Sequence, residues 1–223
     1  AAGRLVGLMS ARLAPADRGD RPRAILRTLS SYATIALANV DAMAALRGAE
    51  RVLARQNAEL ERLADTDRLT GLYNRRFLDR ALQAEFATAR RYGTPFSIII
   101  IDLDHFKQVN DTWGHLAGDE VLAVTAGMIR KRARETDVVG RWGGEEFVVI
   151  CPRTDRDGAR AVAEAMRERV QSHEFAQAGR RTASIGTATW RAGDDAASLT
   201  HRADEALYAA KEGGRNRVVQ AAA

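Results

Sequence analysis

Two neighbouring glutamates, Glu145 and Glu146, follow a pair of glycines in the segment 141–150. β-Favouring residues flank the glycines, and glycine accepts the positive φ angles that a tight hairpin turn requires. The sequence predicts a hairpin over residues 137–150, with both carboxylates directly after its turn. Like charges at the end of a buried strand repel each other, and a divalent cation beside them offsets that repulsion. An ordinary hairpin with solvated glutamates is the alternative interpretation.

An apolar run over residues 96–101 ends in two alternating aspartates, Asp102 and Asp104. A run of this length is typical of a central strand that is buried on both faces. Mg²⁺ prefers oxygen ligands, usually one or two carboxylates plus substrate phosphates, so Asp102 is a candidate ligand. If this strand neighbours the hairpin, Asp102 and Glu145 can bind the same cation. Solvation at the start of a loop, or helix capping, is the alternative for both aspartates.

These residues are part of a longer ordered pattern. The segment 143–147, Gly-Gly-Glu-Glu-Phe, resembles the signature of the GGDEF family, the diguanylate cyclases, in its glutamate-containing variant. Four further segments agree with the family's motifs in order and spacing, at 67–76, 102–119, 183–186 and 208–217. The similarity covers residues 65–219, and five ordered motifs are far more specific than the pentapeptide alone.

The resemblance implies an activity and the residues that perform it. Two GTP molecules would be joined into cyclic di-GMP, with release of two pyrophosphates, across a homodimer in which each subunit holds one GTP. By the motif match, Asp102 and Glu145 would hold two Mg²⁺ (or Mn²⁺) ions, assisted by Glu146 and the backbone carbonyl of Leu103. Glu145 could instead serve as the general base, and the sequence does not separate these roles. Asp102, Glu145 and Glu146 are the candidate catalytic residues.

The same motifs imply contacts to the substrate. Asn110 and Asp119 match the guanine-reading positions, and their carboxamide and carboxylate complement the edge of guanine. A turn asparagine and a helix cap are the alternative interpretations of these two residues. For the lysine and arginine near the C-terminus, the alternative is a basic helix end. The remaining candidate substrate-binding residues are Phe106, Lys107, Lys211 and Arg215.

An Arg-x-x-Asp pattern, Arg134 and Asp137, lies shortly before the glycine pair. The resemblance implies an inhibitory site for the product, in which the arginine forks to cyclic di-GMP and the aspartate accepts from guanine. The family's further arginine is expected after an Ala-Glu pair, but Ala165 stands at that position. Arg167 is a candidate substitute. A surface Arg–Asp ion pair is the alternative.

Periodicity predicts the elements that position these residues. Helices are expected over 75–91, 119–133, 157–171 and 196–212, and strands over 96–102, 182–189 and 218–219 in addition to the hairpin. This order indicates an α+β fold of the ferredoxin-like (βαββαβ) type, an antiparallel or mixed sheet with helices, as in nucleotide cyclases.

A long helix is expected before this domain, starting near Arg23. Apolar residues recur three and four apart from Leu26 to Met43, and the spacing resumes in a new register from Leu46 to Leu63, beside Gly48. We interpret residues 1–45, which include an expected strand at 4–9 and a loop at 14–22, as the remnant of a GAF-like sensory domain or as a dimerising helix. Residues 46–66 are expected to form a coiled-coil signalling linker, with a single amphipathic helix as the alternative, and residues 67–220 the cyclase domain.

Composition restricts the partners. A net charge of +5 suits a site that gathers triphosphates, whereas scattered arginines and 6% aromatic residues argue against nucleic acid. The lone cysteine, Cys151, fits a reducing cytoplasm. We therefore expect a cytoplasmic homodimer that binds GTP and cyclic di-GMP and has no membrane segment within this chain. A catalytically silent nucleotide-binding module, a module whose output is a protein contact, and an enzyme that makes another cyclic dinucleotide are the alternatives.

Overall fold

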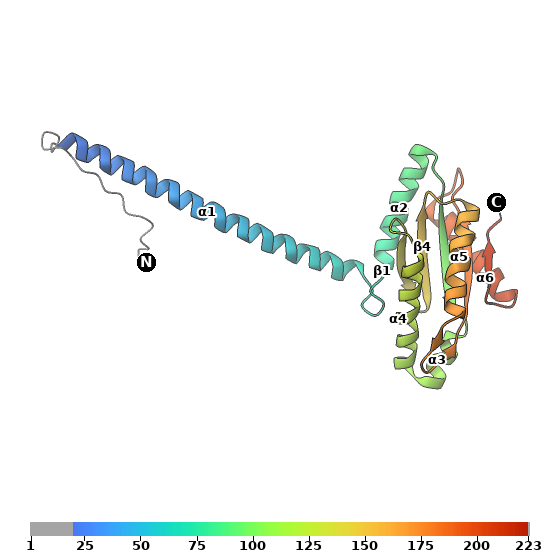
Figure 1. Cartoon of the computed structure of the whole chain (residues 1–223). Helices are drawn as coiled ribbons and strands as arrows, with labels where there is room; N and C mark the ends of the chain where they lie inside the picture. The colour runs from blue at the N-terminus through green and yellow to red at the C-terminus, as the bar shows by residue number, and fades with distance from the viewer. Residues whose placement is uncertain (1–19, 223) are drawn as a thin grey trace. The chain divides into compact units, whose positions relative to one another are not determined.

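The computed structural model describes residues 20–222, and its contacts divide the chain into two compact units, 1–61 and 62–223. The helices are α1 (Asp20–Asp65), α2 (Arg75–Tyr92), α3 (Phe106–Trp113), α4 (His115–Arg132), α5 (Arg156–Gln171) and α6 (Ala196–Glu212) (Figure 1). The strands are β1 (Tyr73–Asn74), β2 (Phe96–Leu103), β3 (Val138–Gly143), β4 (Glu146–Pro152), β5 (Glu174–Phe175), β6 (Gly179–Arg180), β7 (Ala183–Thr189) and β8 (Val218–Gln220).

Six strands form one sheet in the order β1-β3-β4-β2-β7-β8. Strands β3, β4, β2 and β7 pair antiparallel, which confirms the predicted ferredoxin-like βαββαβ sheet. The edge strands β1 and β8 pair parallel with their neighbours, so the whole sheet is mixed. Strands β5 and β6 form a separate short hairpin.

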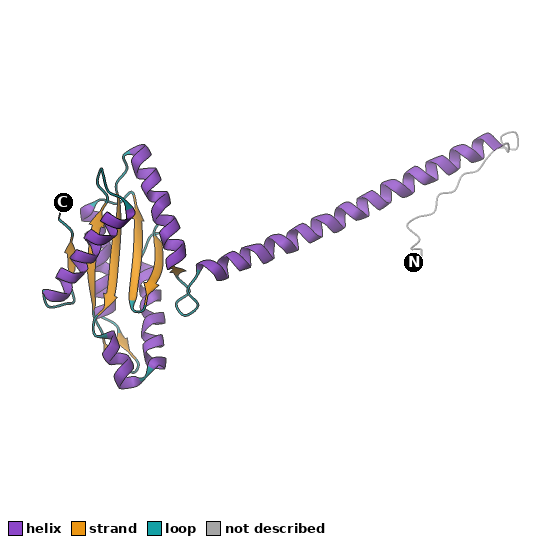
Figure 2. Cartoon of the chain, turned by 180° about the vertical axis from the view of Figure 1, so that it is seen from behind, coloured by secondary structure: helices purple, strands orange, loops and turns teal. Residues whose placement is uncertain are grey.

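Every residue of the central strand β2 is buried, because helices cover both faces of the sheet (Figure 2). Successive side chains of a strand point to opposite faces. Ile99 and Ile101 accordingly belong to the core under α4 and α5, whereas Ile98 and Ile100 belong to the core under α2 and α6. This two-sided burial explains why the run 96–101 is continuously apolar.

Some boundaries differ from the prediction. Helix α3 was not predicted, and α4 begins at His115 rather than at Asp119. The residue before α4, Gly114, has a φ of 81° and makes no side-chain capping hydrogen bond, so the sequence carried no capping signal there. Strands β1, β5 and β6 are two residues long, which is too short for a periodic pattern to reveal.

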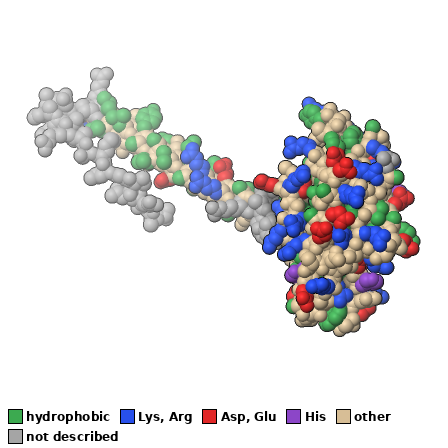
Figure 3. Space-filling view, turned by 45° about the vertical axis from the view of Figure 1, so that its right-hand side comes forward, with side chains coloured by type: hydrophobic (Ala, Val, Ile, Leu, Met, Phe, Trp, Pro, Cys, Tyr) green, Lys and Arg blue, Asp and Glu red, His purple; other side chains and the backbone are tan. Residues whose placement is uncertain are grey.

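Helix α1 is one continuous helix of 46 residues, about 69 Å long at 1.5 Å per residue. It starts at Asp20, so the end of the predicted loop 14–22 is helical, while the predicted strand 4–9 lies outside the described residues. The expected change of register beside Gly48 does not interrupt the helix, and the side chains of residues 57–64 are not among those described. Large apolar side chains are exposed along it (Figure 3): Ile25, Leu29, Tyr32, Ile35, Leu37, Val40, Met43, Leu46, Val52 and Leu53.

One part of α1, Arg23–Ala54, is long and apolar enough to cross a membrane by length and composition alone. Its most apolar window has a mean hydropathy of 1.2, and none of that window is buried within the protein. A single helix of this kind near an N-terminus is weak evidence for a membrane span, because signal sequences pass the same test. The expected absence of a membrane segment stays a prediction.

Candidate active site

Asp102 and Glu146 lie opposite each other at one end of the sheet. Asp102, near the end of β2, pairs with Glu146, the first residue of β4, and on its other side with Ser184 of β7. Directly opposed residues in an antiparallel pair carry their Cβ atoms about 4.5–5.5 Å apart on the same face of the sheet. Asp102 is only 6% exposed. The sheet therefore brings together two carboxylates that are far apart in the sequence.

Glu145 lies in the hairpin turn itself. Gly143 pairs with Glu146, so the turn consists of Gly144 and Glu145, and of the two glycines only Gly144 has a positive φ, at 47°. The prediction of a Gly-Gly turn with both glutamates after it was wrong by one residue. The cause is an irregularity in the pairing between Arg141 and Gly143. Glu145 is thus held by the turn and Glu146 by the sheet.

The carboxylates share one basic partner. Lys211 Nζ, from the last turn of α6, lies 2.8 Å from Asp102 Oδ2. Burial raises the pKa of Asp102, which Lys211 lowers in part and the charge of Glu145 raises further. Burial also raises the pKa of Glu146, and the charge of Asp102 adds to that effect. The site therefore holds more negative charge than Lys211 neutralises, and it favours an additional cation.

The donor atoms fit a hard divalent cation. Asp102, Glu145 and Glu146 offer carboxylate oxygens, and Leu103 offers a backbone carbonyl beside them, which are the ligand types that Mg²⁺ prefers. Within residues 20–222, no three His, Cys, Asp or Glu side chains already converge as a metal cluster. Lys211 supplies the positive charge that Asp102 faces. Mg²⁺ commonly takes only one or two carboxylates from the protein and completes its shell with water and substrate phosphates, so this donor set suits an ion that arrives with a nucleotide.

Asp104 has a structural role. It is 4% exposed and accepts hydrogen bonds from Thr182 Oγ1 at 2.6 Å, Ser184 Oγ at 2.7 Å and the backbone N–H of Asn216 at 3.1 Å. It is therefore neither a solvated loop residue nor the cap of α3, whose N-cap is His105. The bond to Asn216 holds the loop that follows α6.

The two guanine-reading candidates come from consecutive helices. Asn110, in α3, lies against Gly118 of α4, because a Cβ atom on Gly118 would be 1.9 Å from Asn110 Oδ1. Gly118 thus makes room for the carboxamide. Asp119 is the next residue and is exposed. Both alternatives fail, since Asn110 is inside a helix rather than a turn and Asp119 lies beyond the first turn of α4, which begins at His115.

The other substrate-binding candidates differ in how accessible they are. Phe106 is 8% exposed and borders the Asn110 side chain, since the same Cβ on Gly118 would lie 3.2 Å from Phe106 Cζ. Lys107, on α3, and Arg215, in the loop after α6, are exposed. Neither makes an ion pair within the described part of the chain, whereas Lys211 is paired with Asp102. Lys107 and Arg215 are therefore available for phosphates.

Arg134 and Asp137 close a turn between α4 and β3. Asp137 is 3% exposed, and its Oδ2 accepts the backbone N–H of Arg134 at 2.8 Å. The surface ion pair that served as the alternative is absent from the described residues. Asp137 Oδ1 is buried and has no hydrogen-bond partner among them, while the Arg134 side chain is exposed. The motif thus leaves one acceptor and one guanidinium unused.

Arg167, the candidate substitute for the missing arginine, already has partners. Its Nε donates to Glu164 at 2.7 Å, and its Nη1 donates to Gln171 at 2.6 Å and to Asn216 at 2.9 Å. These contacts tie α5 to the loop after α6 rather than to the Arg134 turn. Using Arg167 at the inhibitory site would break all three bonds.

Sequence analysis missed a link between the motif at residues 67–76 and the hairpin. Asp67 accepts hydrogen bonds from the backbone and hydroxyl of Thr70, at 2.9 and 2.7 Å, and from Arg141 Nη1 at 3.3 Å. The Nε of the same arginine donates to the carbonyl of Gly144 at 2.9 Å. Arg141 therefore joins the loop after α1 to the turn that carries Glu145. No periodic or spacing signal in the sequence pairs these residues.

A second missed residue is Asp204. Its charge contributes to the raised pKa of Glu146, and burial raises its own pKa. Asp204 precedes Lys211 by two helical turns, so both lie on the same face of α6. This seven-residue spacing is the sequence signal from which Asp204 could have been placed near Lys211.

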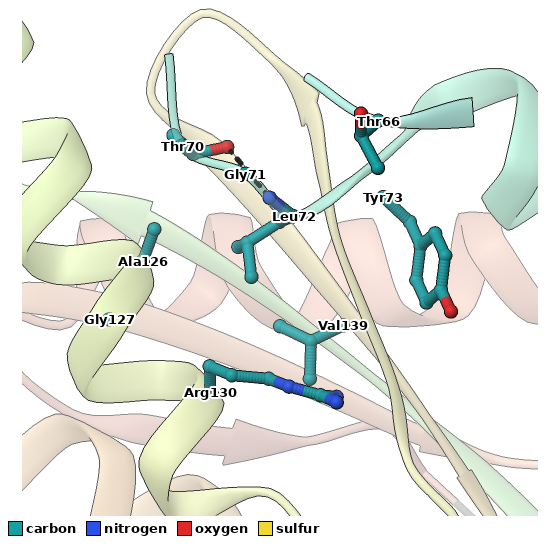
Figure 4. Close-up of a pocket in the computed structure, with 9 residues that line it drawn as sticks. All are labelled: Thr66, Thr70, Gly71, Leu72, Tyr73, Ala126, Gly127, Arg130 and Val139. Atoms are coloured by element: carbon teal, nitrogen blue, oxygen red, sulfur yellow. Dashed lines mark hydrogen bonds between the residues drawn. The ribbon is translucent and has the colours of Figure 1, made fainter. Parts of the chain in front are cut away.

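A cavity of about 360 Å³ lies between the loop 66–73, α4 and β3 (Figure 4). Figure 4 shows Arg130 extending from α4 beneath Val139, with Leu72 above them. The cavity is lined by Thr66, Thr70, Gly71, Leu72, Tyr73, Ala126, Gly127, Arg130 and Val139. None of the candidate site residues is among these, so we do not assign this cavity to the reaction.

Comparison with protein families and relatives agrees with the motifs. A family model described as "Diguanylate cyclase, GGDEF domain" matches residues 64–217. The chain is 42% identical over 156 residues to the diguanylate cyclase DgcP of Pseudomonas aeruginosa, covering 69% of this chain and 23% of that protein. It is 46% identical over 167 residues to the response regulator PleD of Caulobacter vibrioides, covering 72% and 37%. The chain thus spans well under half the length of these relatives.

Solved structures give the same result for the fold. The coiled coil and GGDEF domain of DgcB from Caulobacter crescentus, in complex with c-di-GMP, matches with a TM-score of 0.75 and 37% identity, covering 82% of this chain and 99% of that one. The diguanylate cyclase SiaD from Pseudomonas aeruginosa, in complex with its activator SiaC, matches with a TM-score of 0.73 and 36% identity, covering 90% and 79%.

Proposed function

This chain belongs to the GGDEF family of diguanylate cyclases, and we propose that it joins two GTP molecules into cyclic di-GMP and releases two pyrophosphates. The proposal rests on one observation above all. Two carboxylates, Asp102 and Glu146, lie opposite each other on adjacent strands, and Glu145 lies in the turn beside them. Burial and mutual repulsion raise the pKa values of Asp102 and Glu146, which supports a site where a cation and a triphosphate enter together.

In the proposed reaction, the 3′-hydroxyl of each GTP attacks the α-phosphorus of the other. The new phosphorus–oxygen bond forms as the bond to the β-phosphate oxygen breaks, so pyrophosphate leaves and the hydroxyl proton passes to a base. Phosphoryl transfer depends mainly on in-line positioning and on neutralising charge. Asp102, Glu145 and Glu146, with the carbonyl of Leu103, would hold the Mg²⁺ or Mn²⁺ ions, which polarise the phosphate and acidify the hydroxyl.

The nucleotide is proposed to be oriented by residues of α3, α4 and α6 and of the loop after α6. Asn110 and Asp119 are proposed to read guanine, and Phe106, which also lies beside Gly118, is proposed to contact the substrate. Lys107 and Arg215 are proposed to contact the phosphates. Lys211, which pairs with Asp102 in the cation-free protein, is proposed to turn to the triphosphate, since Asp102 would then serve as a ligand of the cation.

The reaction requires two GTP molecules face to face, and each chain provides one set of carboxylates. We therefore propose a homodimer, with the exposed apolar side chains of α1 as part of its interface. The division into a sensory remnant or dimerising helix at 1–45, a coiled-coil linker at 46–66 and a cyclase domain at 67–220 is proposed on the same basis. A cytoplasmic location is proposed because GTP is the substrate.

Product binding at Arg134 and Asp137 is proposed as a further property of the domain. The buried Asp137 Oδ1 lacks a hydrogen-bond partner within the described residues, and guanine N–H groups are suitable donors for it. The exposed guanidinium of Arg134 can fork to phosphate or to the guanine edge. Because Arg167 is engaged elsewhere and Ala165 has no charge, we expect this site to be weaker than one with a further arginine.

Incubation of the purified chain with GTP and Mg²⁺, followed by chromatography, tests the main proposal. We expect cyclic di-GMP and pyrophosphate from the parent chain and no product from Glu145→Ala. Glu168→Ala is the matched control, since Glu168 is an exposed glutamate on α5 outside the candidate site, and it should retain full activity.

Two outcomes would contradict the proposal. A dimeric parent that binds GTP but forms no cyclic dinucleotide would indicate a catalytically silent binding module. Equal activity of the parent and Glu145→Ala would remove Glu145 from the catalytic site. Formation of another cyclic dinucleotide from mixed nucleotides would change the substrate while leaving the reaction type in place.

A further inference from the structure

A pair of adjoining cavities lies beside the edge strand β8, at the opposite end of the sheet from the catalytic carboxylates. The first has a volume of about 240 Å³, and the second, of about 400 Å³, shares part of its lining. The residues common to both are Arg191, Arg202, Gln220, Ala221 and Ala222. The first cavity is below the usual size of a pocket for a drug-sized ligand, and the second provides room for a longer molecule.

Two residues that line the first cavity carry buried N–H groups that have no acceptor within the described part of the chain. Trp190 Nε1 and Arg202 Nε are both buried and lack a hydrogen-bond partner within residues 20–222. A buried donor without a partner is costly, and a native structure usually satisfies it with a ligand, ion or water. Indole and guanidinium groups are donors only. A molecule that satisfies them must therefore present hydrogen-bond acceptors, as a carboxylate or phosphate group does.

The charge of the lining selects an anion. Arg156, Arg191 and Arg202 line the first cavity, and no acidic residue among those described does so, whereas Glu205 lines the second. Arg202 is partly neutralised by its ion pair with Asp194 and also donates to the Thr189 carbonyl at 2.8 Å. The Arg191 side chain is 53% exposed, and its Nε lies 3.8 Å from Asp194 Oδ1, which makes this ion pair weak.

Of the three arginines, Arg156 has the positive charge that is least neutralised by other side chains. Its guanidinium is exposed and makes no ion pair within the described part of the chain. Its backbone carbonyl accepts from Gln220 Nε2 at 2.6 Å, which fixes the start of α5 against the end of β8. The cavity wall is thus held together while this guanidinium stays available.

The cavity is separate from the proposed nucleotide site. It borders Thr187 and Thr189 of β7, and Thr189 pairs with Ser97, whereas Ser184 pairs with Asp102. Ser97 and Asp102 are five residues apart on β2, about 17 Å at 3.3–3.4 Å per residue. A single phosphate bound at Asp102 therefore does not reach this lining.

We propose that this cavity binds a small organic anion, whose carboxylate or phosphate group accepts from Trp190 and Arg202 and faces Arg156 and Arg191. The rest of the ligand extends into the adjoining cavity along β8. The proposal is independent of the cyclase activity, because none of these residues belongs to the candidate catalytic or nucleotide-binding set.

The indole N–H signals of the three tryptophans in a ¹⁵N-labelled full chain provide the test. Each signal is assigned with a Trp→Phe variant, and the protein is titrated with inorganic phosphate and, separately, with acetate, at an ionic strength kept constant with sodium chloride. We expect a saturable shift of the Trp190 signal, with no comparable saturable shift of Trp113 or Trp142. A response to phosphate alone identifies a phosphoryl ligand, and a response to acetate identifies a carboxylate ligand.

The double variant Arg156→Gln/Arg191→Gln changes only exposed side chains and should raise the apparent Kd on the order of tenfold. Arg160→Gln is the matched control, because Arg160 is an exposed arginine on the same helix that does not line either cavity. It should leave the titration unchanged. The proposal is overturned if neither anion shifts the Trp190 signal saturably, or if the double variant binds as tightly as the parent.

Discussion

At the scale of single residues, the charged carboxylates of the candidate site lower the stability of the fold. Glu146 is half-buried beside Asp102, and both pKa values are raised, in each case first by burial. A carboxyl group of this kind contributes its full stability below its unfolded pKa, ordinarily 4.5 for glutamate, and loses that contribution as the pH rises through the folded value. The ionised candidate carboxylates therefore destabilise the cation-free protein near neutral pH.

We expect Glu146→Gln to raise the Tm of the metal-free protein by roughly 1–3 °C at pH 7, the partial exposure of Glu146 limiting the effect. The difference should shrink as the pH falls through the raised pKa of Glu146 and vanish below its ordinary pKa of 4.5, where the glutamate of the parent is protonated in both the folded and the unfolded state. Thermal unfolding in the presence of a chelator measures this directly. Glu168→Gln should show no such pH-dependent gain, and a loss of stability in Glu146→Gln at pH 7 would contradict the electrostatic account.

Two glycines of α4, Gly118 and Gly127, allow an effect on GTP binding to be distinguished from an effect on helix propensity. A Cβ at Gly118 would collide with Asn110 Oδ1, whereas a Cβ at Gly127 would meet nothing within 4 Å. We expect Gly118→Ala to displace the Asn110 carboxamide and raise the KM for GTP about tenfold, as for the loss of one buried hydrogen bond. Gly127→Ala should leave KM unchanged and stabilise the helix by about 0.5–1 kcal/mol. Steady-state kinetics and denaturant unfolding distinguish them, and equal KM values would exclude Gly118 as the support of Asn110.

The same residues show how far the sequence predicts the site. The strand-end position of Asp102 and the adjacent hairpin predict that Asp102 lies near the hairpin glutamates, with Glu145 as its expected partner. The register instead places Glu146 opposite Asp102, and Glu145 lies in the turn. The pairing of Lys211 with Asp102 was not predicted, because it depends on how α6 packs across the sheet. Asp104 was misinterpreted for a similar reason. Two of its hydrogen-bond donors are Ser184 of β7 and Thr182, the residue directly before that strand.

At the scale of elements, Arg141 connects the loop after α1 to the turn that carries Glu145. Burial by itself raises the pKa of Asp67, but hydrogen bonds from Thr70 and the charge of Arg141 hold it below its usual range. The carboxylate is thus kept ionised as the anchor of Arg141, whose Nε holds the Gly144 carbonyl. We infer that the link fixes the position of Glu145 in the turn.

Arg141→Ala should therefore lower kcat on the order of ten- to a hundredfold, because a small displacement of a catalytic group has a large effect on rate. The affinity for GTP, measured by calorimetry, should change little, since Arg141 does not contact the guanine-reading residues. Asp67→Asn should have the same effect in weaker form, because its amide oxygen can still accept from Arg141. A variant with normal kcat would show that the turn holds Glu145 without this link.

The elements that escaped prediction share a physical cause. Helix α3 follows His105, a left-handed residue without a capping side chain, and its eight residues are mostly polar, so neither a cap nor a long stripe marks it. The longer helices α2, α5 and α6 carry capping side chains at Asn74, Asp155 and Asp195, and their predicted starts agree with the structure to within one residue. Capping side chains therefore predicted the starts of the helices that have them.

At the scale of the whole molecule, the central question is whether α1 brings two catalytic units together. Its exposed apolar side chains include Leu46 at 61% and Leu53 at 58%, which are unfavourable in water unless another surface covers them. A second copy of the same helix is the partner that the proposed two-substrate reaction requires. Activity should then depend on the monomer–dimer equilibrium.

We expect Leu46→Glu/Leu53→Glu to shift the protein to monomers and to make its specific activity rise in proportion to protein concentration, as for a bimolecular encounter. The parent should show constant specific activity over the same micromolar range. Arg47→Glu/Arg51→Glu is the control, because it changes the charge more strongly on the same stretch of α1 while leaving the predicted apolar stripe intact. Light scattering gives the mass of each variant, and product formation at several concentrations gives the order of the reaction. If the leucine variant stays dimeric, or if a monomeric parent is fully active, α1 is not the element that pairs the two sites.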